Sequence, residues 1–86
     1  MNVAQQFGDN LKRVRREADM SQDETSVRAS VHRTEISQIE RGLRIPRIDT
    51  LVKLMGALEA DAIELLEGIV WEPGDVRLGR FGGAEG

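Results

Sequence analysis

The segment Ser21-Gln22-Asp23-Glu24 constrains the fold more than any other stretch of the sequence. A Ser followed three residues later by a Glu is the capping box. In it the hydroxyl accepts from a free backbone N–H, and the Glu carboxylate accepts from the N–H of the cap residue. The segment predicts a short helix over 22–29, a tight turn at Ser30-Val31 and a further helix over 33–41. Gly42 ends that further helix because glycine accepts positive φ without strain.

Apolar periodicity predicts three more helices in this chain of 86 residues. A helix over 4–18 carries one apolar stripe, formed by Phe7, Leu11, Val14 and Ala18. The segment 48–58 is the most apolar, and Asp61 with Glu64 forms a second cap-like pair that opens a fifth helix. We therefore expect residues 1–67 to fold as an all-α bundle of five short helices, in which 22–29 and 33–41 form a helix-turn-helix.

Residues 68–86 differ in character from the helical part. The run Ile69-Val70-Trp71 is β-prone, the next four residues are turn-like, and Val76 and Leu78 alternate with polar neighbours. Residues 79–86 contain four glycines and are expected to fray. This C-terminal tail is therefore expected to be a short β-prone segment that forms a strand or a dimerisation arm.

Composition excludes several classes of function. Without cysteine the chain has no disulfide framework, thiolate metal site or thiol nucleophile. No apolar run reaches the ~18–20 residues of a membrane-spanning helix, so no membrane partner is expected. The absence of cysteine fits a reducing cytosol, so the cytoplasm is the expected location. One histidine and no Gly-rich phosphate loop leave no catalytic set, so neither an enzyme nor a cofactor is expected. The spacing of Asp61, Glu64 and Glu67 suggests a cation site, but helix capping explains it better, and no metal is expected.

The net charge of −3 hides an asymmetry along the chain. Residues 1–48 hold nine Lys and Arg against seven Asp and Glu, a net of +2, whereas residues 49–86 hold three against eight, a net of −5. Such a separation is itself a signal of a charged partner. The net negative charge of the chain is therefore compatible with nucleic-acid binding by its N-terminal half.

The order of short motifs along residues 7–66 resembles the lambda-repressor-like, Cro/XRE-type helix-turn-helix domain. The motifs that carry the resemblance are Ser21-Gln22-x-Glu24, Ile36-Ser37-x-Ile39-Glu40-Arg41-Gly42, Arg44-x-Pro46, Thr50-Leu51 and Glu64-Leu65-Leu66. The resemblance implies a sequence-specific DNA-binding transcriptional regulator, a small dimeric repressor that reads the major groove of double-stranded DNA with the helix over 33–41. An antitoxin-like protein-interaction module of the same fold is the alternative.

The polar face of the helix over 33–41 is the expected site of base contacts. With Ile36 and Ile39 buried, the opposite face carries side-chain types that read base edges. The family places base contacts in the first half of this helix, which here gives Arg33, Thr34, Ser37 and Gln38. The alternative is a solvated helix face that is polar without reading DNA.

Phosphate contacts are expected at both ends of this helix and at the start of the helix before it. Such contacts set the register of a protein on DNA and carry no sequence information. The expected set is Gln22, His32, Arg41, Arg44 and Arg47. The alternative for the arginines is ordinary surface charge, and the alternative for His32 is a partly exposed substitute for the usual N-cap.

The resemblance also implies a structural ion pair between Arg15 and Glu40, since an unneutralised acid beside the DNA would repel it. The chain departs from the family pattern at Ser30, where glycine is usual, and at Thr25-Ser26, where Leu-Ala is usual. A non-glycine residue at positive φ is strained by ~1 kcal/mol. We therefore expect a domain of modest stability.

The family usually binds as a two-fold dimer, and a homodimer is expected here. Candidate interface residues are Ile63, Leu66, Ile69, Val70, Trp71 and Phe81. An exposed strand with aromatic side chains is costly unless it is covered. Residues 69–81 are therefore expected to pack on a second subunit. The open alternatives are that Trp71 folds back on its own core, or that the tail binds another protein.

Overall fold

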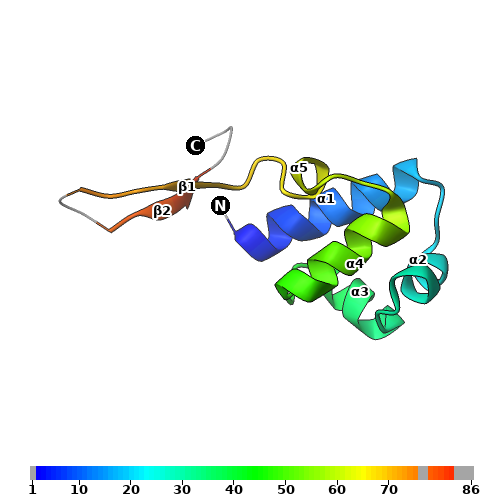
Figure 1. Cartoon of the computed structure of the whole chain (residues 1–86). Helices are drawn as coiled ribbons and strands as arrows, with labels where there is room; N and C mark the ends of the chain where they lie inside the picture. The colour runs from blue at the N-terminus through cyan, green and yellow to red at the C-terminus, as the bar shows by residue number, and fades with distance from the viewer. Residues whose placement is uncertain (1, 76–77, 83–86) are drawn as a thin grey trace.

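The structure is a computed structural model that describes residues 2–75 and 78–82 (Figure 1). Its helices are α1 (Val3–Glu17), α2 (Gln22–Ala29), α3 (Arg33–Glu40), α4 (Ile48–Leu58) and α5 (Ala62–Leu65). Two strands follow, β1 (Val70–Glu72) and β2 (Arg80–Gly82). The expected bundle of five helices with a short β tail is confirmed, and the predicted helix ends lie within a residue of the observed ones.

The core of the bundle is aliphatic. The innermost side chains, fully buried, are Leu11, Ile36, Ile39, Leu54 and Leu65. They come from α1, α3, α4 and α5, and α2 packs across α3 and α4. Phe7 is the one aromatic side chain that the core contains. The remaining two lie in the tail, where they contribute nothing to the bundle.

Local signals fix the start and the end of the two central helices. The Ser21 Oγ accepts from the Glu24 N–H at 3.0 Å, and the Glu24 carboxylate accepts from the Ser21 N–H at 3.1 Å. Gly42, which follows the C-cap residue Arg41 of α3, has a φ of +75°, as its position predicted. Ser30 ends α2 with a φ of +54°, so the expected non-glycine residue in the left-handed region is present.

Gly8 and Asn10 of α1 set how α1 packs against its neighbours. A Cβ at Gly8 would lie 2.3 Å from the Ile39 carbonyl oxygen, so α1 crosses the end of α3 at backbone distance. Asn10 is fully buried, and its amide donates to the Leu65 and Glu67 carbonyls at 2.9 and 2.8 Å. The Asn10 side chain therefore holds the end of α5 against α1, a role that sequence reasoning missed.

The tail is an antiparallel hairpin in which Val70 pairs with Gly82, Trp71 with Phe81 and Glu72 with Arg80. The prediction of a frayed end from residue 79 is wrong for 80–82, which form β2; residues 83–86 lie outside the described residues. Leu78 of the predicted alternation lies outside β2, and Val76 lies outside the described residues. Cross-strand pairing decides the position of β2, because the Trp71 and Phe81 rings meet edge to face at 5.1 Å.

The hairpin projects from the bundle and does not return to it. Figure 1 shows β1 and β2 extending away from the helices, and the principal extents of the molecule are 46 × 20 × 19 Å. Ile69 packs against the core, but Trp71 stays 52% exposed. The alternative in which Trp71 folds back on its own core is therefore wrong.

Candidate nucleic-acid interface

The helix α3 is anchored on one side and open on the other. Ile36 and Ile39 are fully buried in the core. All four predicted base-contacting residues lie on α3 at the spacing of one helix face: Arg33 and Thr34 are exposed, and Ser37 and Gln38 are half-buried. A helix held in this way presents hydrogen-bonding side chains in a fixed orientation.

His32 begins α3. Its Nδ1 accepts from the Thr34 N–H at 3.4 Å, which makes the ring the N-cap of the helix. The imidazole thus takes the place of the usual small polar cap, and it remains exposed. Contact between its other ring nitrogen and a phosphate stays a prediction.

Arg33 has a partner that sequence reasoning missed. Its Nε lies 2.9 Å from the Asp23 carboxylate in the first turn of α2, and both side chains are largely exposed. Engagement of Nε leaves the two terminal nitrogens of the guanidinium as free donors. The sequence identifies Asp23 only as part of the capping segment. No local pattern shows that the packing of α2 on α3 brings Asp23 beside Arg33.

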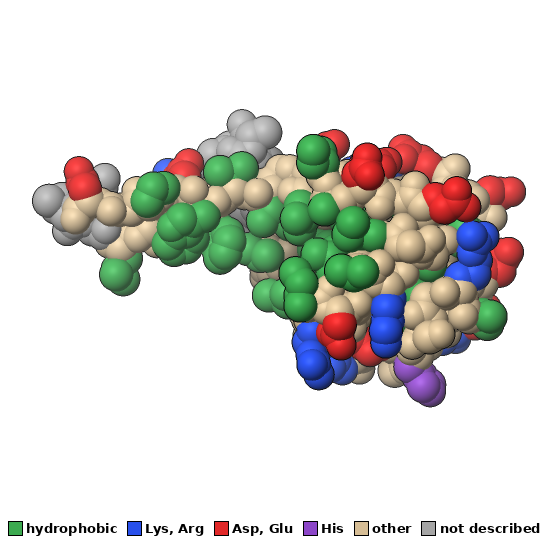
Figure 2. All heavy atoms as spheres, in the orientation of Figure 1, with side chains coloured by type: hydrophobic (Ala, Val, Ile, Leu, Met, Phe, Trp, Pro, Cys, Tyr) green, Lys and Arg blue, Asp and Glu red, His purple; other side chains and the backbone are tan. Residues whose placement is uncertain are grey.

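The end of α3 and the following loop carry exposed positive charge. Within residues 2–75 and 78–82, Arg41 and Arg44 have no ion-pair partner, whereas Arg47 lies 3.6 Å from Asp49. On the face that Figure 2 shows, most acidic side chains lie along the top and right of the bundle, and basic side chains lie at the lower edge, beside α3 and the start of α4. On this face the cations beside α3 are therefore set apart from most of the acidic side chains.

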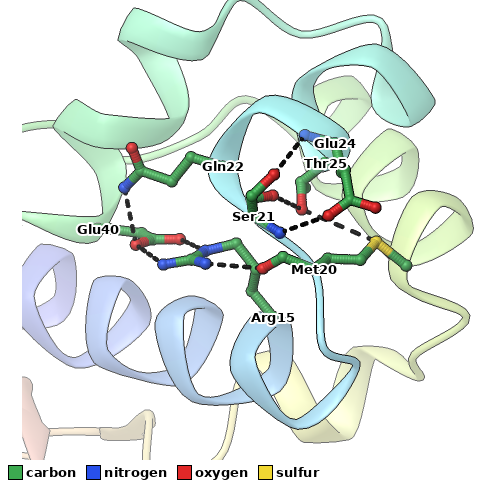
Figure 3. Close-up of polar contacts among 7 residues, drawn as sticks. All are labelled: Arg15, Met20, Ser21, Gln22, Glu24, Thr25 and Glu40. Carbon is green, nitrogen blue, oxygen red and sulfur yellow. Dashed lines mark hydrogen bonds and ion pairs between the residues drawn. The ribbon is translucent and has the colours of Figure 1, made fainter.

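A buried ion pair lies behind this surface (Figure 3). Arg15 of α1 donates to both carboxylate oxygens of Glu40 on α3, at 2.6 and 3.0 Å, and its third nitrogen donates to the Met20 carbonyl at 2.8 Å. The hydrogen bonds from Arg15 to Glu40 raise the pKa of the guanidinium above its ordinary value, against the opposing effect of burial. The ion pair implied by the family resemblance is present.

Gln22 belongs to the same network. Its Nε2 donates to a Glu40 carboxylate oxygen at 3.1 Å (Figure 3). The amide group that was expected on a DNA phosphate is thus engaged inside the protein in this structure. Arg15, Gln22 and Glu40 come from α1, α2 and α3, so the network ties together the helices that frame the polar face.

The candidate dimer residues differ in their surroundings. Ile63 and Leu66 are exposed on and just after α5, and Val70, Trp71 and Phe81 are exposed on the hairpin. Ile69 is half-buried against its own core, which leaves it little surface for a partner. The hairpin and α5 therefore remain the candidate surfaces.

Other kinds of site find no support in the described residues. They contain no cluster of three potential metal ligands. Glu64 accepts from the Asp61 N–H at 2.9 Å, as its capping role predicted, and Glu67 faces Arg13 at 3.9 Å. Among residues 2–75 and 78–82 no helix combines the length and apolar character needed to cross a bilayer.

The chain matches the HTH_3 helix-turn-helix family over residues 11–65. It belongs to that family. The uncharacterized HTH-type transcriptional regulator y4dJ of Sinorhizobium fredii is 35% identical over 66 residues, which cover 77% of this chain and 86% of that protein. The control protein C.BamHI of Bacillus amyloliquefaciens is 34% identical over 67 residues, covering 77% and 83%. The resemblance to DNA-binding transcriptional regulators is thereby confirmed.

Solved structures agree with this membership. The restriction-modification controller protein C.Esp1396I covers 77% of this chain and 87% of its own length, with a TM-score of 0.70 and 27% identity. The controller protein C.AhdI from Aeromonas hydrophila covers 72% and 94%, with the same TM-score of 0.70. C.Esp1396I has also been solved as a tetramer in complex with its natural 35 base-pair operator, and that structure matches with a TM-score of 0.69.

Proposed function

We propose that this chain is a sequence-specific operator-binding regulator, a small homodimeric repressor that acts in the cytoplasm and reads the major groove with α3. The observation that carries the proposal is the polar face of an anchored α3, flanked by the unpaired cations Arg41 and Arg44. Family membership adds support, as does the operator complex of the similar controller protein C.Esp1396I.

The chemistry of each polar side chain on α3 suits it to a particular role in reading the base pairs. Arg33 suits the O6 and N7 acceptors of guanine, Gln38 suits the N6 and N7 edge of adenine, and Thr34 and Ser37 fit several partners. Arg41 and Arg44 suit backbone phosphates, which set register. The predicted phosphate contacts of Gln22, His32 and Arg47 remain part of the proposal; for Gln22 they require release from Glu40.

Selection of bound duplexes from random DNA tests the proposal directly. On the selected duplex, Arg33→Ala is expected to cost about 1–3 kcal/mol and to relax preference at one base pair. Arg44→Ala is expected to weaken binding to all duplexes alike and to reduce the salt dependence by about one phosphate contact. A readout role for Arg33 is refuted if both variants lose affinity uniformly over all sequences.

An antitoxin-like interaction module is the second candidate, and the exposed Trp71 and Phe81 of the hairpin favour it. The two candidates differ in how duplex binding responds to salt. A DNA reader loses affinity steeply, with a slope of about −0.9 per neutralised phosphate. A pure interaction module enriches no duplex in the selection, and that result would favour it over the regulator.

A further inference from the structure

The C-terminal hairpin has two chemically different faces. Side chains alternate along a strand, so the cross-strand pair Trp71 and Phe81 lies on one face, and Glu72 and Arg80 lie on the other. Glu72 and Arg80 form an ion pair at 2.6 Å. The Trp71 ring lies over Gly79, where a Cβ would come within 2.4 Å of it. The hairpin is therefore built to present one aromatic face.

Nothing in the described part of the chain covers this aromatic face fully. Trp71 is 52% exposed and Phe81 45%, and an isolated two-stranded hairpin is marginally stable in water. Gly68, at a φ of +79°, and Ile69, packed on the core, direct the hairpin away from its own bundle. The described part of the chain therefore leaves this face open to another molecule.

The helix α4 carries a second uncovered apolar surface. Its inner side buries Leu54, Ala57 and Leu58, yet Ile48 and Val52, one helical turn apart on the outer side, are 77% and 59% exposed. A helix that is apolar on both sides is normally buried on both sides. Figure 2 shows hydrophobic side chains both on the hairpin and on the α4 side of the bundle, on the same face of the molecule.

We propose that the hairpin of one copy packs its Trp71–Phe81 face onto the outer side of α4, at Ile48 and Val52, in a second copy. The inference rests on the homodimer proposed above and assigns the surface that each copy contributes. Edge-to-edge pairing of two hairpins would leave both aromatic faces and both α4 surfaces exposed, whereas this exchange covers all of them. In a two-fold dimer it is reciprocal, so each copy gives one hairpin and receives one.

The available area favours a second copy over a one-sided partner. Half-exposed Trp and Phe side chains offer together roughly 200 Å² of contact surface. A stable interface needs about 800 Å² on each partner, so a single hairpin contact is too small. Reciprocal exchange makes two such contacts and adds the exposed α4 surface of each copy to the buried area.

Disulfide trapping tests the contact cleanly because the chain contains no cysteine. Val52→Cys and Phe81→Cys are made as separate proteins, mixed and oxidised, and disulfide-linked dimers are measured on non-reducing gels. Separate proteins can only join between molecules, so cross-linking of the mixture, and of neither protein alone, is the expected result.

Val27→Cys is the matched control for Val52→Cys, because Val27 is an exposed valine on α2. Its mixture with Phe81→Cys is expected to stay monomeric on the gel. Cross-linking of Phe81→Cys alone would show that two hairpins contact each other, and it would overturn the proposed contact with α4. A dimer in sedimentation that gives no Val52–Phe81 cross-link would also overturn the proposed contact, but it would support the proposed homodimer. A protein that is monomeric at all concentrations would refute both the contact and the homodimer.

The dimer dissociation constant provides an independent readout. Trp71→Ala and Val52→Asp are each expected to raise it at least tenfold in sedimentation equilibrium, with an unchanged far-ultraviolet circular dichroism spectrum. Leu43→Ala removes an equally exposed apolar side chain from the loop after α3 and is expected to leave the constant within twofold. Equal effects of Leu43→Ala and Trp71→Ala would refute a specific hairpin contact.

Discussion

Replacement of Arg15 by alanine leaves the Glu40 carboxylate buried without its ion-pair partner. That side chain is only 3% exposed and accepts three hydrogen bonds, two of them from Arg15. Loss of one partner of a buried pair costs about 3–5 kcal/mol because the remaining charge stays uncompensated. The Met20 carbonyl loses a donor in the same substitution. This cost is a large part of the ~5–15 kcal/mol that stabilises a typical domain.

Thermal and urea unfolding followed by far-ultraviolet circular dichroism measure this cost. At roughly 4–8 °C per kcal/mol for a domain of this size, Tm of Arg15→Ala should fall by about 12 °C or more. Arg16→Ala is the matched control: it is the next residue of α1, exposed and without an ion-pair partner in the described residues. Its effect should stay within ~0.5 kcal/mol.

A double replacement separates a stranded charge from simple loss of packing. Arg15→Leu combined with Glu40→Leu removes both charges, and it should recover most of the stability that either single replacement loses. Equal Tm values for Arg15→Ala and Arg16→Ala would refute the reasoning. So would a double variant whose loss equals the sum of the two single losses, since that would mean no coupling between the side chains.

Three further predictions concern stability and are checked by the same unfolding measurements. Gly8→Ala should be strongly destabilising because its Cβ would lie 2.3 Å from a backbone oxygen. Gly56→Ala, in the last turn of α4, meets nothing within 4 Å and should gain up to ~0.5–1 kcal/mol; equal effects would contradict the close approach of α1 and α3. Asn10→Ala should cost about 1–3 kcal/mol, since the buried Leu65 carbonyl and the partly buried Glu67 carbonyl each lose a donor. Ser30→Gly should gain up to ~1 kcal/mol by relieving the positive φ, and a loss would contradict strain at this turn.

The helices were predictable because their signals are local. The capping box at Ser21 and the glycine at position 42 act within a few residues, and the apolar stripes repeat every turn. The resemblance added the pair of Arg15 and Glu40, which lie 25 residues apart and share no local pattern. The fold and the location of the polar helix face thus followed from the sequence.

The remaining features depend on distances that appear only once the chain is folded. Asp23 meets Arg33 because two helices cross, and Gln22 reaches Glu40 for the same reason. The strand β2 lies at 80–82 because Phe81 pairs with Trp71 across the hairpin, while the local pattern of that segment is dominated by glycine. Local propensity is weak evidence wherever a partner strand sets the register.

Trp71 is the single tryptophan of the chain, and it lies on the hairpin, outside the hydrophobic core. Its fluorescence therefore reports on the surroundings of the hairpin and not on the integrity of the bundle. The pairing of β1 with β2 involves only residues 70–82, so the hairpin opens without disturbing any core contact of the helices. An emission change on dilution or heating would precede the loss of helical signal, and a melting temperature taken from fluorescence would describe the arm rather than the DNA-binding domain.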